Sequence, residues 1–487
     1  MRGSRGSYLV AEAAGLQDWI VGNATELRVI RGGSRLLGDA FAAAIEDLEG
    51  ELGPASRPSG GWDGSRWQVI ATASGRISAL LGPDVDAEQA AMIVRSRLAR
   101  DLPGLTTSVG VAPINDLGAT GGAFEDARQD AGEAALRSGT RLPASYHLGT
   151  STCDVSGSET ASAEATREGW RLSPTSRRRL AADVGDLGRP DVTIERQMGE
   201  IGRSTVSHRY SGYVGVVSAD GNAIGERFRD LRSASQVEET SEAISAAIGR
   251  AEEAAFDAAV AAHVAAGGEL PLRLNPIVRA GDDLRYVLPA HVALAFARAL
   301  VAGAADLQAC AGVLLCHAGL PFSLAHDAAE DLLGQAKRTS RAATPVGGGP
   351  FVAFSVESGS QVGATTTLGD LSASPYHADE LQALLEVGTG LEVSTSQLRS
   401  AAAALRAGGR IAAREWALLV LSLDRGDTER LESLWRALGA ENDLVDAPFP
   451  VRRDRPGEDG PVATSVAPLG DLLLLRALTP VRSEVPA

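Results

Sequence analysis

The sequence is poor in cysteine, in aromatic residues and in positive charge. Only Cys153, Cys310 and Cys316 are cysteines among 487 residues, which excludes a disulfide-rich scaffold and fits a reducing compartment. Aromatic residues make up 4% of the chain, so small aliphatic side chains must fill its cores. Lys and Arg number 46 against 62 Asp and Glu. The net charge of −16 argues against a protein that wraps nucleic acid by neutralising phosphates.

Long apolar runs and targeting signals are also lacking. The longest uncharged stretch, 307–325, contains Gln308, His317 and Pro321, so it predicts a buried strand and a loop rather than a membrane span. No basic segment followed by an apolar one opens the chain. We therefore expect a cytoplasmic protein without membrane contact. Its length predicts about three domains.

Two stretches of the chain share one predicted order of elements: a strand, a helix, a hairpin, a helix, a strand and a helix. In the second stretch, the run Val237–Ala266 has apolar residues at helical spacing, and two strands flank the turn 280–283. In the first stretch, two strands flank the turn 74–76. This order predicts the ferredoxin-like split βαβ arrangement, with helices over one face of an antiparallel-rich sheet.

The closing helices of the two stretches align without gaps. This alignment sets Asp126 on Asp327 and Leu136 on Lys337, and it favours an internal duplication. The predicted fold class is therefore α/β (α+β), with two ferredoxin-like domains in tandem and a helical domain after them.

Composition divides the chain into four predicted parts. Residues 1–140 form the first repeat, 141–205 a polar linker, 206–358 the second repeat and 359–487 a helical C-terminal domain. A charged, proline-containing connector is expected at 451–461. Helices of the last domain are expected at 377–387, 396–407, 411–422, 428–438 and near 469–478.

Three carboxylates are predicted to converge in the second repeat. Asp220 ends its first strand, and Asp282 and Asp283 occupy the hairpin tip. The first strand lies beside the hairpin strand in a ferredoxin-like sheet, so these side chains should meet. Clustered oxygen ligands suit Mg²⁺ or Mn²⁺, and two such ions can activate an attacking hydroxyl and stabilise a leaving pyrophosphate. Acidic turns are also common on protein surfaces, which is the alternative for each motif taken alone.

Residues around these carboxylates are candidates for nucleotide binding. Lys337 can reach a triphosphate as a point charge. Four more residues of the two turns, three of them glycines that allow the backbone to approach phosphates, complete the predicted nucleotide site: Gly221, Asn222, Gly225 and Gly281. The first repeat has no carboxylate at its hairpin tip and only Glu12 near its first strand end. One repeat is equipped for metal-dependent phosphoryl chemistry and the other is not.

These residues and the segments around them resemble a known protein family. The segments 213–225 (YVGVVSADGNAIG), 276–287 (PIVRAGDDLRYV) and 311–338 resemble the second palm domain of the large subunit of type III CRISPR effector complexes, the Cas-ten family. Palm domains of this type are also similar to GGDEF nucleotide cyclases. The segment 14–37 resembles the opening of the family's first palm, which is normally degenerate.

The resemblance implies an enzyme that converts ATP into cyclic oligoadenylate messengers for antiviral defence. It implies a degenerate and an active palm facing each other, with Asp220, Asp282 and Asp283 as ligands of two Mg²⁺ or Mn²⁺ ions and Lys337 on phosphate. It also implies partner subunits of a CRISPR-type effector complex, bound through the helical C-terminal domain, with RNA held only indirectly. A stand-alone relative is the other possibility that the resemblance leaves open.

The sequence departs from the family pattern in three places. The family's Gly-Gly-Asp-Asp here begins with Ala280. The spacing of a four-cysteine zinc ribbon is kept by 153–156 and 173–176, but three of its four positions are serine, so no structural zinc is expected. No His-Asp pair precedes the first palm, and His326-Asp327 lies in a predicted helix, so no HD nuclease is expected.

Two other functions fit parts of the sequence. The lost zinc ribbon and the altered turn are compatible with a catalytically silent scaffold that binds partner proteins. The turn 280–283 also fits a GGDEF-type dinucleotide cyclase, although such enzymes usually pair two identical palms. Binding of ATP separates the enzyme from the scaffold, and a preference for GTP would favour the dinucleotide cyclase.

Overall fold

The structure is a computed structural model of mixed α/β architecture, which confirms the predicted fold class at that level. Its longest continuous stretch is the 120-residue segment Ile224–Ala343. It describes residues 5–22, 26–56, 62–73, 75–117, 122–138, 151–156, 159–161, 169–183, 187–203, 206, 211–222, 224–343, 349–357, 374–390, 452–457, 460–465 and 475.

The first unit is a four-stranded sheet with the strand order β2-β3-β1-β4. The central strand β1 runs antiparallel to both β3 and β4. Its elements follow the predicted order: β1 (Gly6–Ala14), the short α1 (Leu16–Ile20), α2 (Leu27–Leu52), β2 (Trp67–Ala73), β3 (Arg76–Leu81), α3 (Ala87–Asp101), β4 (Thr106–Ile114) and α4 (Gly122–Ser138).

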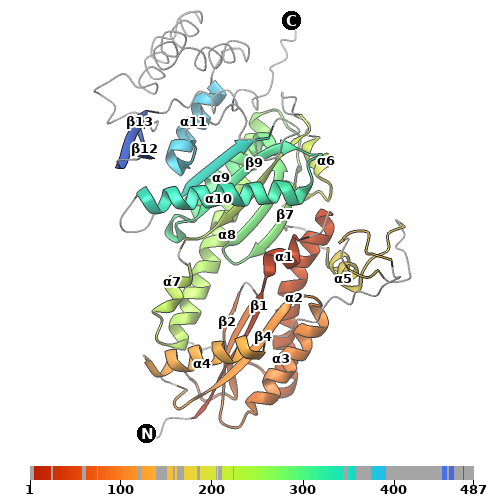
Figure 1. The fold of residues 1–487 in the computed structure, drawn as a ribbon, viewed down its shortest axis with the longest axis vertical. Coiled ribbons are helices and arrows are strands. Elements are labelled where there is room, and N and C mark those ends of the chain that lie inside the picture. Colours follow the sequence, from red (N-terminus) through yellow and green to blue (C-terminus); the bar gives the residue numbers. More distant parts are fainter. Residues whose placement is uncertain are drawn as a thin grey trace, which may run out of the picture.

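The second unit is a seven-stranded sheet with the order β11-β10-β9-β6-β8-β7-β5. Four of its strands repeat the first unit, and short strands extend both edges (Figure 1). Its elements are β5 (Val192–Ile194), β6 (Tyr213–Asp220), α7 (Ile224–Arg229), α8 (Ala234–Ala265), β7 (Leu272–Ala280), β8 (Asp283–Pro289), α9 (Ala290–Gly303), β9 (Cys310–His317), α10 (Phe322–Ala343), β10 (Phe351–Val356) and β11 (Tyr376–His377).

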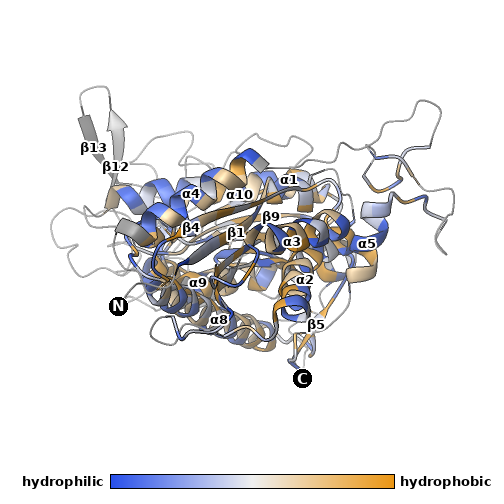
Figure 2. Ribbon diagram, turned by 90° about the horizontal axis from the view of Figure 1, so that it is seen from below, coloured by the Kyte–Doolittle hydropathy of each residue, from blue (hydrophilic) through white to orange (hydrophobic). Residues whose placement is uncertain are grey.

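Helices cover both faces of each sheet, so the expectation of helices on one face only is wrong. Val214 and Val216 of β6 share a core with α10, whereas Val217 and Ala219, which point to the opposite face, pack with α8 and α9. Figure 2 shows α4 and α10 on one side of the sheets and α2, α3, α8 and α9 on the other. The closing helices α4 and α10 thus cover the face opposite to the one that the other helices cover.

The two units are related by one shared packing detail. In both, a glycine of the strand before the closing helix lies against the helix backbone: an added Cβ would overlap the carbonyl oxygen of Ala131 at Gly110 and that of Ala329 at Gly312. This equivalence shifts the pairing of the closing helices by three residues, so Lys337 does not correspond to the Leu136 that the gap-free alignment gives. The gap-free alignment is therefore wrong by three residues. Three residues are nearly one helical turn, so the wrong alignment still pairs apolar positions with apolar positions.

Replacing Gly312 by alanine is expected to destabilise the protein by about 1–3 kcal/mol, because α10 must move away from β9 to make room for the methyl group. Gly249→Ala is the matched control. It lies on the exposed side of α8 with nothing within 4 Å of the added carbon, and it should stabilise the protein by up to about 1 kcal/mol. Urea denaturation measures both. Equal free energies of unfolding for the two variants would contradict the packing described here.

The segment between the units packs against α2. Here α5 (Pro174–Ala182) and α6 (Met198–Gly202) lie within the predicted linker. Gly32 of α2 makes the contact possible, because a Cβ there would overlap the Arg179 carbonyl oxygen of α5. The Arg179 guanidinium lies over the Trp19 ring, 4.0 Å from its centroid. The described part of the segment thus packs against the first unit, and its strand β5 pairs with β7 of the second.

The four positions with zinc-ribbon spacing lie together in this segment. The Cys153 Sγ is 3.4 Å from the Ser176 Oγ, and the Ser156 amide donates to Sγ at 3.5 Å. The Ser176 amide in turn donates to the Ser173 Oγ at 3.0 Å. Burial raises the pKa of the Cys153 thiol, but hydrogen bonds with Ser156 and Ser176 outweigh it and lower that pKa to about 7.

The C-terminal part is described only in pieces. The helix α11 (Ala378–Gly390) confirms the one expected at 377–387, and the expected helices at 396–407, 411–422 and 428–438 lie outside the described residues, as does all of 469–478 except residue 475. An antiparallel pair, β12 (Arg452–Gly457) and β13 (Gly460–Ser465), occupies the place of the predicted connector. No helix among the described residues is long and apolar enough to cross a membrane.

Candidate functional site

The candidate site lies where β6 ends beside the β7–β8 hairpin. β6 pairs antiparallel with β8 from Val214 to Ala219, and Asp220 is its last residue. Ala280 and Asp283 close the hairpin in register, so that Gly281 and Asp282 form a two-residue loop. Gly281 has a φ of 65°, which this position of a tight hairpin requires and which Ala280, an extended strand residue, does not need. The predicted convergence of the carboxylates thus arises from strand pairing.

Asp220 and Asp282 face each other. The Lys337 Nζ of α10 forms a close ion pair with the Asp220 Oδ2. Burial, together with the charge of Asp220, raises the pKa of Asp282 to about 7. An added Cβ at Gly221 would lie 3.2 Å from the Asp282 Oδ2, so the glycine keeps the space between the two strand ends open. A carboxyl group that titrates near neutral pH at a strand end is a candidate for catalysis or metal binding.

Asp283 lies in a different environment. Its carboxylate forms a close ion pair with the Arg285 guanidinium, which is 2% exposed and also lies 3.0 Å from the Glu330 Oε1 of α10. Burial raises the pKa of Asp283, against the opposing effect of Arg285. The arginine therefore fixes the orientation of this carboxylate and ties the hairpin to α10.

The donor set fits a divalent cation. Four carboxylates (Asp220, Asp282, Asp283 and Glu330) face two cationic side chains (Lys337 and Arg285), which leaves two negative charges uncompensated when all are ionised. Mg²⁺ is commonly held by one or two carboxylates, with phosphate oxygens and water completing its shell. Asp220 and Asp282 meet that requirement. Among the residues that the structure describes, no group of three or more His, Cys, Asp or Glu side chains is arranged to hold a metal by itself.

The other predicted site residues have separate positions. The Asn222 side chain is 4% exposed and donates to the Gln308 carbonyl oxygen at 2.9 Å, so it anchors the loop after β6. Gly225, in the first turn of α7, is exposed with open space around it. Gly221 and Gly281 flank the two facing carboxylates. Of the predicted nucleotide contacts, Lys337 and these two glycines lie at the carboxylates themselves.

A cavity of about 230 Å³ connects the candidate site with the first unit. Gly281 and Asp282 line one end of it, and the first sheet contributes Tyr8, Arg76 and Arg128 from β1, β3 and α4. The rest of its lining comes from α7, from the N-terminal half of α8 and from two smaller residues of the first sheet. Sequence reasoning missed these three residues, because only the folded chain brings them to the second unit.

The first unit carries different chemistry at the equivalent positions. The strand registers place Glu12 on Asp220, Gly75 on Asp282 and Arg76 on Asp283. The Arg76 Nη1 lies 3.2 Å from the Glu12 Oε1. This single ion pair leaves no uncompensated charge for a cation at these positions of the first unit.

The fold has solved counterparts, although no family model and no curated protein matches the sequence. The chain is similar to a chain of the Csm1-Csm4 cassette in complex with cA4, with a TM-score of 0.56 and 13% identity over 97% of this chain and 70% of that one. The likeness shows a shared fold.

Two further structures agree with it. The cassette in complex with cA3 gives a TM-score of 0.57 at 13% identity over 98% of this chain and 70% of that one. The Csm1-Csm4 subcomplex of the type III-A CRISPR-Csm interference complex gives 0.56 at 14% identity over the same shares. The expected similarity to a type III CRISPR subunit is therefore confirmed at the level of the fold.

Proposed function

We propose that this chain is a metal-dependent nucleotidyltransferase that converts ATP into a cyclic oligoadenylate. The observation that carries the proposal is the pair of facing carboxylates, Asp220 and Asp282, beside a cavity shared by the two units. Residues 1–140 would be a degenerate palm domain and 206–358 an active one. Crystal structures of the similar cassette contain ATP, AMPPNP, pppApA and cA4, which supports nucleotide chemistry on this fold.

In this proposal the second unit binds the donor nucleotide. Asp220 and Asp282 would hold Mg²⁺ or Mn²⁺, which supplies charge neutralisation at the phosphate oxygens when bound. Lys337 forms an ion pair with Asp220, and in this proposal its ammonium group would also contact the triphosphate of the donor. Asp283 is held by Arg285 and would serve a second cation only after leaving that ion pair. The residues contribute position and charge rather than covalent chemistry.

The first unit would then hold the acceptor nucleotide. Arg76 and Arg128 line the cavity from the first unit, and the Tyr8 side chain, also in its lining, is buried. The Arg128 Nη1 donates to the Phe228 carbonyl oxygen at 2.6 Å, which fixes its direction. A ribose hydroxyl brought between these arginines and Asp282 would lie next to the donor phosphate. This explains why a unit without metal ligands is kept beside the active one.

We also propose that the chain works with protein partners of a CRISPR-type effector complex, through the helical C-terminal domain predicted at 359–487. The support is that its structural counterparts are Csm1-Csm4 assemblies. RNA would be held by other subunits, as the net charge of −16 indicates.

Incubation with ATP and Mg²⁺ or Mn²⁺, analysed by chromatography and mass spectrometry, tests the reaction. Cyclic oligoadenylate and pyrophosphate are expected from the chain, alone or with its partner subunits. A cyclic dinucleotide formed from GTP would point to the dinucleotide cyclase instead. Absence of metal-dependent ATP binding in calorimetry would contradict an enzyme and favour the scaffold.

Cation binding should depend on pH. Asp282 must lose its proton to bind a cation, and burial and Asp220 raise its pKa to about 7. The dissociation constant for Mn²⁺ should therefore fall about tenfold per pH unit up to about pH 7 and level off above it. Electron paramagnetic resonance of free Mn²⁺ measures this. Asp282→Asn should bind weakly at every pH, and a native affinity that is constant from pH 5.5 to 8 would refute the assignment.

A further inference from the structure

Glu252 of α8 contacts both strands of the β7–β8 hairpin. Its side chain is 7% exposed. Its two carboxylate oxygens accept hydrogen bonds from the Nε and the Nη2 of Arg279, at 2.7 and 2.8 Å. The Tyr286 hydroxyl donates a further hydrogen bond to the same carboxylate. Arg279 belongs to β7 and Tyr286 to β8, so one buried carboxylate joins the two strands to the helix.

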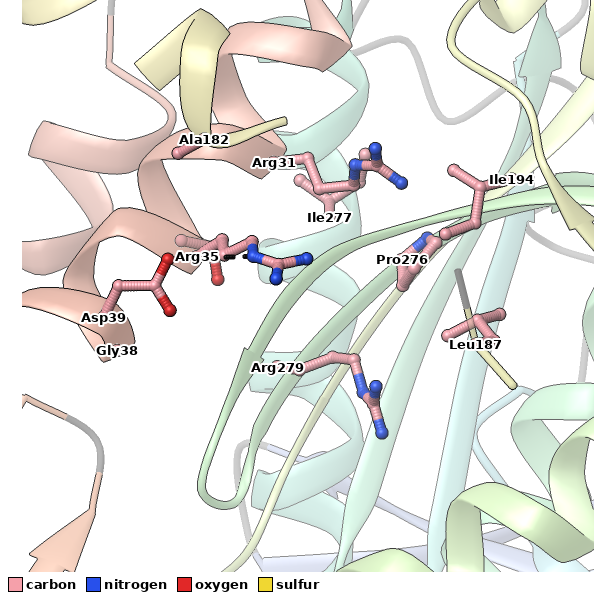
Figure 3. A pocket seen from close by; sticks show the side chains of 11 residues that line it. Arg31, Arg35, Gly38, Asp39, Ala182, Leu187, Ile194, Pro276, Ile277 and Arg279 are labelled. Carbon is pink, nitrogen blue, oxygen red and sulfur yellow. Dashed lines mark ion pairs between the residues drawn. The ribbon is translucent and has the colours of Figure 1, made fainter. Parts of the chain in front are cut away.

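The side chains that Glu252 contacts lie on one face of the hairpin. The strand register sets Arg279 opposite Leu284, and Leu284 and Tyr286 belong to the core that β8 shares with α8 and α9. Residues opposite each other in an antiparallel pair point to the same face. Arg279 borders a cavity of about 330 Å³ between α2 and β7, but its guanidinium is directed away from Arg35 of α2 (Figure 3). The charge of Arg279 is thus used on α8.

This contact lies directly behind the candidate site. Ser241 and Ser245 of α8 line the 230 Å³ cavity together with Asp282. Glu252 follows Ser245 by seven residues, which is about 10 Å along a helix. Arg279 precedes Asp282 by three residues, which is about 10 Å along a strand. The helix and the hairpin therefore run beside each other from the cavity to Glu252.

The surroundings of the contact are apolar. Tyr286 is fully buried, and its ring centroid lies 5.9 Å from that of Phe256 and 4.7 Å from that of Phe296. Burial and the charge of Glu252 raise the pKa of the Tyr286 hydroxyl well above its usual value, so it remains a hydrogen-bond donor. Apolar residues can often replace such a buried ion pair without loss of stability, whereas hydrogen bonds to a carboxylate fix direction.

We propose that Glu252 is a positioning residue for Asp282. Its hydrogen bonds to the two strands hold the hairpin against α8, so that the carboxyl group of Asp282 stays opposite Asp220. The ion pair of Arg285 with Glu330 holds the same hairpin to α10 from its other face. The inference rests on the cation site of the proposed function, in which Asp282 is a ligand.

The affinity of the full chain for Mn²⁺ at pH 8, measured well below the melting temperature, tests this role. Electron paramagnetic resonance of free Mn²⁺ gives the dissociation constant without any turnover. Glu252→Gln should raise this constant at least tenfold, and Tyr286→Phe, which removes only the bond to β8, should raise it less. Glu253→Gln is the matched control, because this next residue of α8 is 67% exposed and pairs with Arg189; it should leave the constant unchanged.

A double variant separates position from stability. Glu252→Gln combined with Arg279→Met removes both charges of the ion pair, so the melting temperature should return close to the native value. The Mn²⁺ dissociation constant should nevertheless stay at least tenfold above the native one. Amide hydrogen exchange over residues 279–286 should also stay at least tenfold faster than in Glu253→Gln, because the hairpin is no longer held to α8.

Two outcomes would overturn the proposal: a Mn²⁺ affinity that recovers together with the melting temperature in the double variant, or native exchange rates in the hairpin. Either would mean that Glu252 contributes to stability alone. A native chain that binds no Mn²⁺ would contradict the proposed function instead. The exchange rates, which need no cation, would still decide the role of Glu252.

Discussion

Asp282→Asn should reduce product formation about a thousandfold or more and leave the fold at least as stable as the native one. The asparagine keeps the shape of the side chain but removes the charge that holds a cation beside the phosphates. Turnover of ATP with saturating Mn²⁺, measured by release of pyrophosphate, gives the loss of activity. Product formation at a native rate would exclude Asp282 from the site.

The stability of this variant follows from the same pKa. Burial and the neighbouring Asp220 raise the pKa of Asp282 to about 7 in the folded chain, above the ordinary 3.8. Protonation therefore favours the folded state: the stability it contributes is full below about pH 4 and is lost as the pH rises through 7. At pH 8 the ionised carboxylate costs on the order of 1–2 kcal/mol after solvent screening, and asparagine removes that cost. Urea denaturation at pH 5 and pH 8 should show a smaller decline for Asp282→Asn than for the native protein.

Asp283→Asn is the matched comparison one residue away. Burial raises the pKa of Asp283 although Arg285 opposes it, so ionised Asp283 also disfavours the folded state, and Asp283→Asn should stabilise the protein less than Asp282→Asn at pH 8. The two neighbouring carboxylates thus differ in the size of their effect on stability. If both variants were stabilised equally, the ion pair with Arg285 would be irrelevant to folding.

Local patterns predicted much of the second unit. The helical spacing of Val237–Ala266 gave the helix that the structure places at Ala234–Ala265, because its apolar face is fixed by local sequence. The turn at Gly281 and Asp282 was also readable, since a two-residue loop needs a glycine. The pairing of β5 with β7 could not be predicted, because a parallel strand of three residues has no recognisable sequence pattern. The hairpin β12–β13 was missed for a related reason: its charged, proline-containing sequence looks like a connector.

The candidate site was predictable only on its acidic side. Asp220 and Asp282 stand at strand ends within one repeat, and the spacing of the repeat predicts that they meet. The opposite wall, with Arg76 and Arg128, comes from the other unit, where the hairpin tip that holds Arg76 looked merely degenerate and Arg128 carried no signal. Arg285 was overlooked because alternation along a strand makes a charged residue look exposed, whereas β8 is covered by helices on both faces.

Arg285→Met should lower the free energy of unfolding by about 3–5 kcal/mol at pH 8, an expected loss of about 10 °C in melting temperature. The guanidinium is 2% exposed and compensates two carboxylates, Asp283 and Glu330, that come from β8 and α10. Methionine fills the space but leaves both carboxylates without their cation in a half-buried place. Thermal and urea denaturation measure the loss.

The pH dependence of this variant separates electrostatics from packing. If uncompensated charge causes the loss, protonating the carboxylates at pH 4.5 should restore much of the stability, and adding Glu330→Gln to Arg285→Met should restore part of it at pH 8. Arg203→Met is the control, since Arg203 is 74% exposed and pairs with Glu200 at the surface, where such a pair contributes at most about 1 kcal/mol. A loss that is equal at pH 4.5 and pH 8 would mean that Arg285 acts through its volume. Its ion pairs would then not be what fixes the orientation of Asp283.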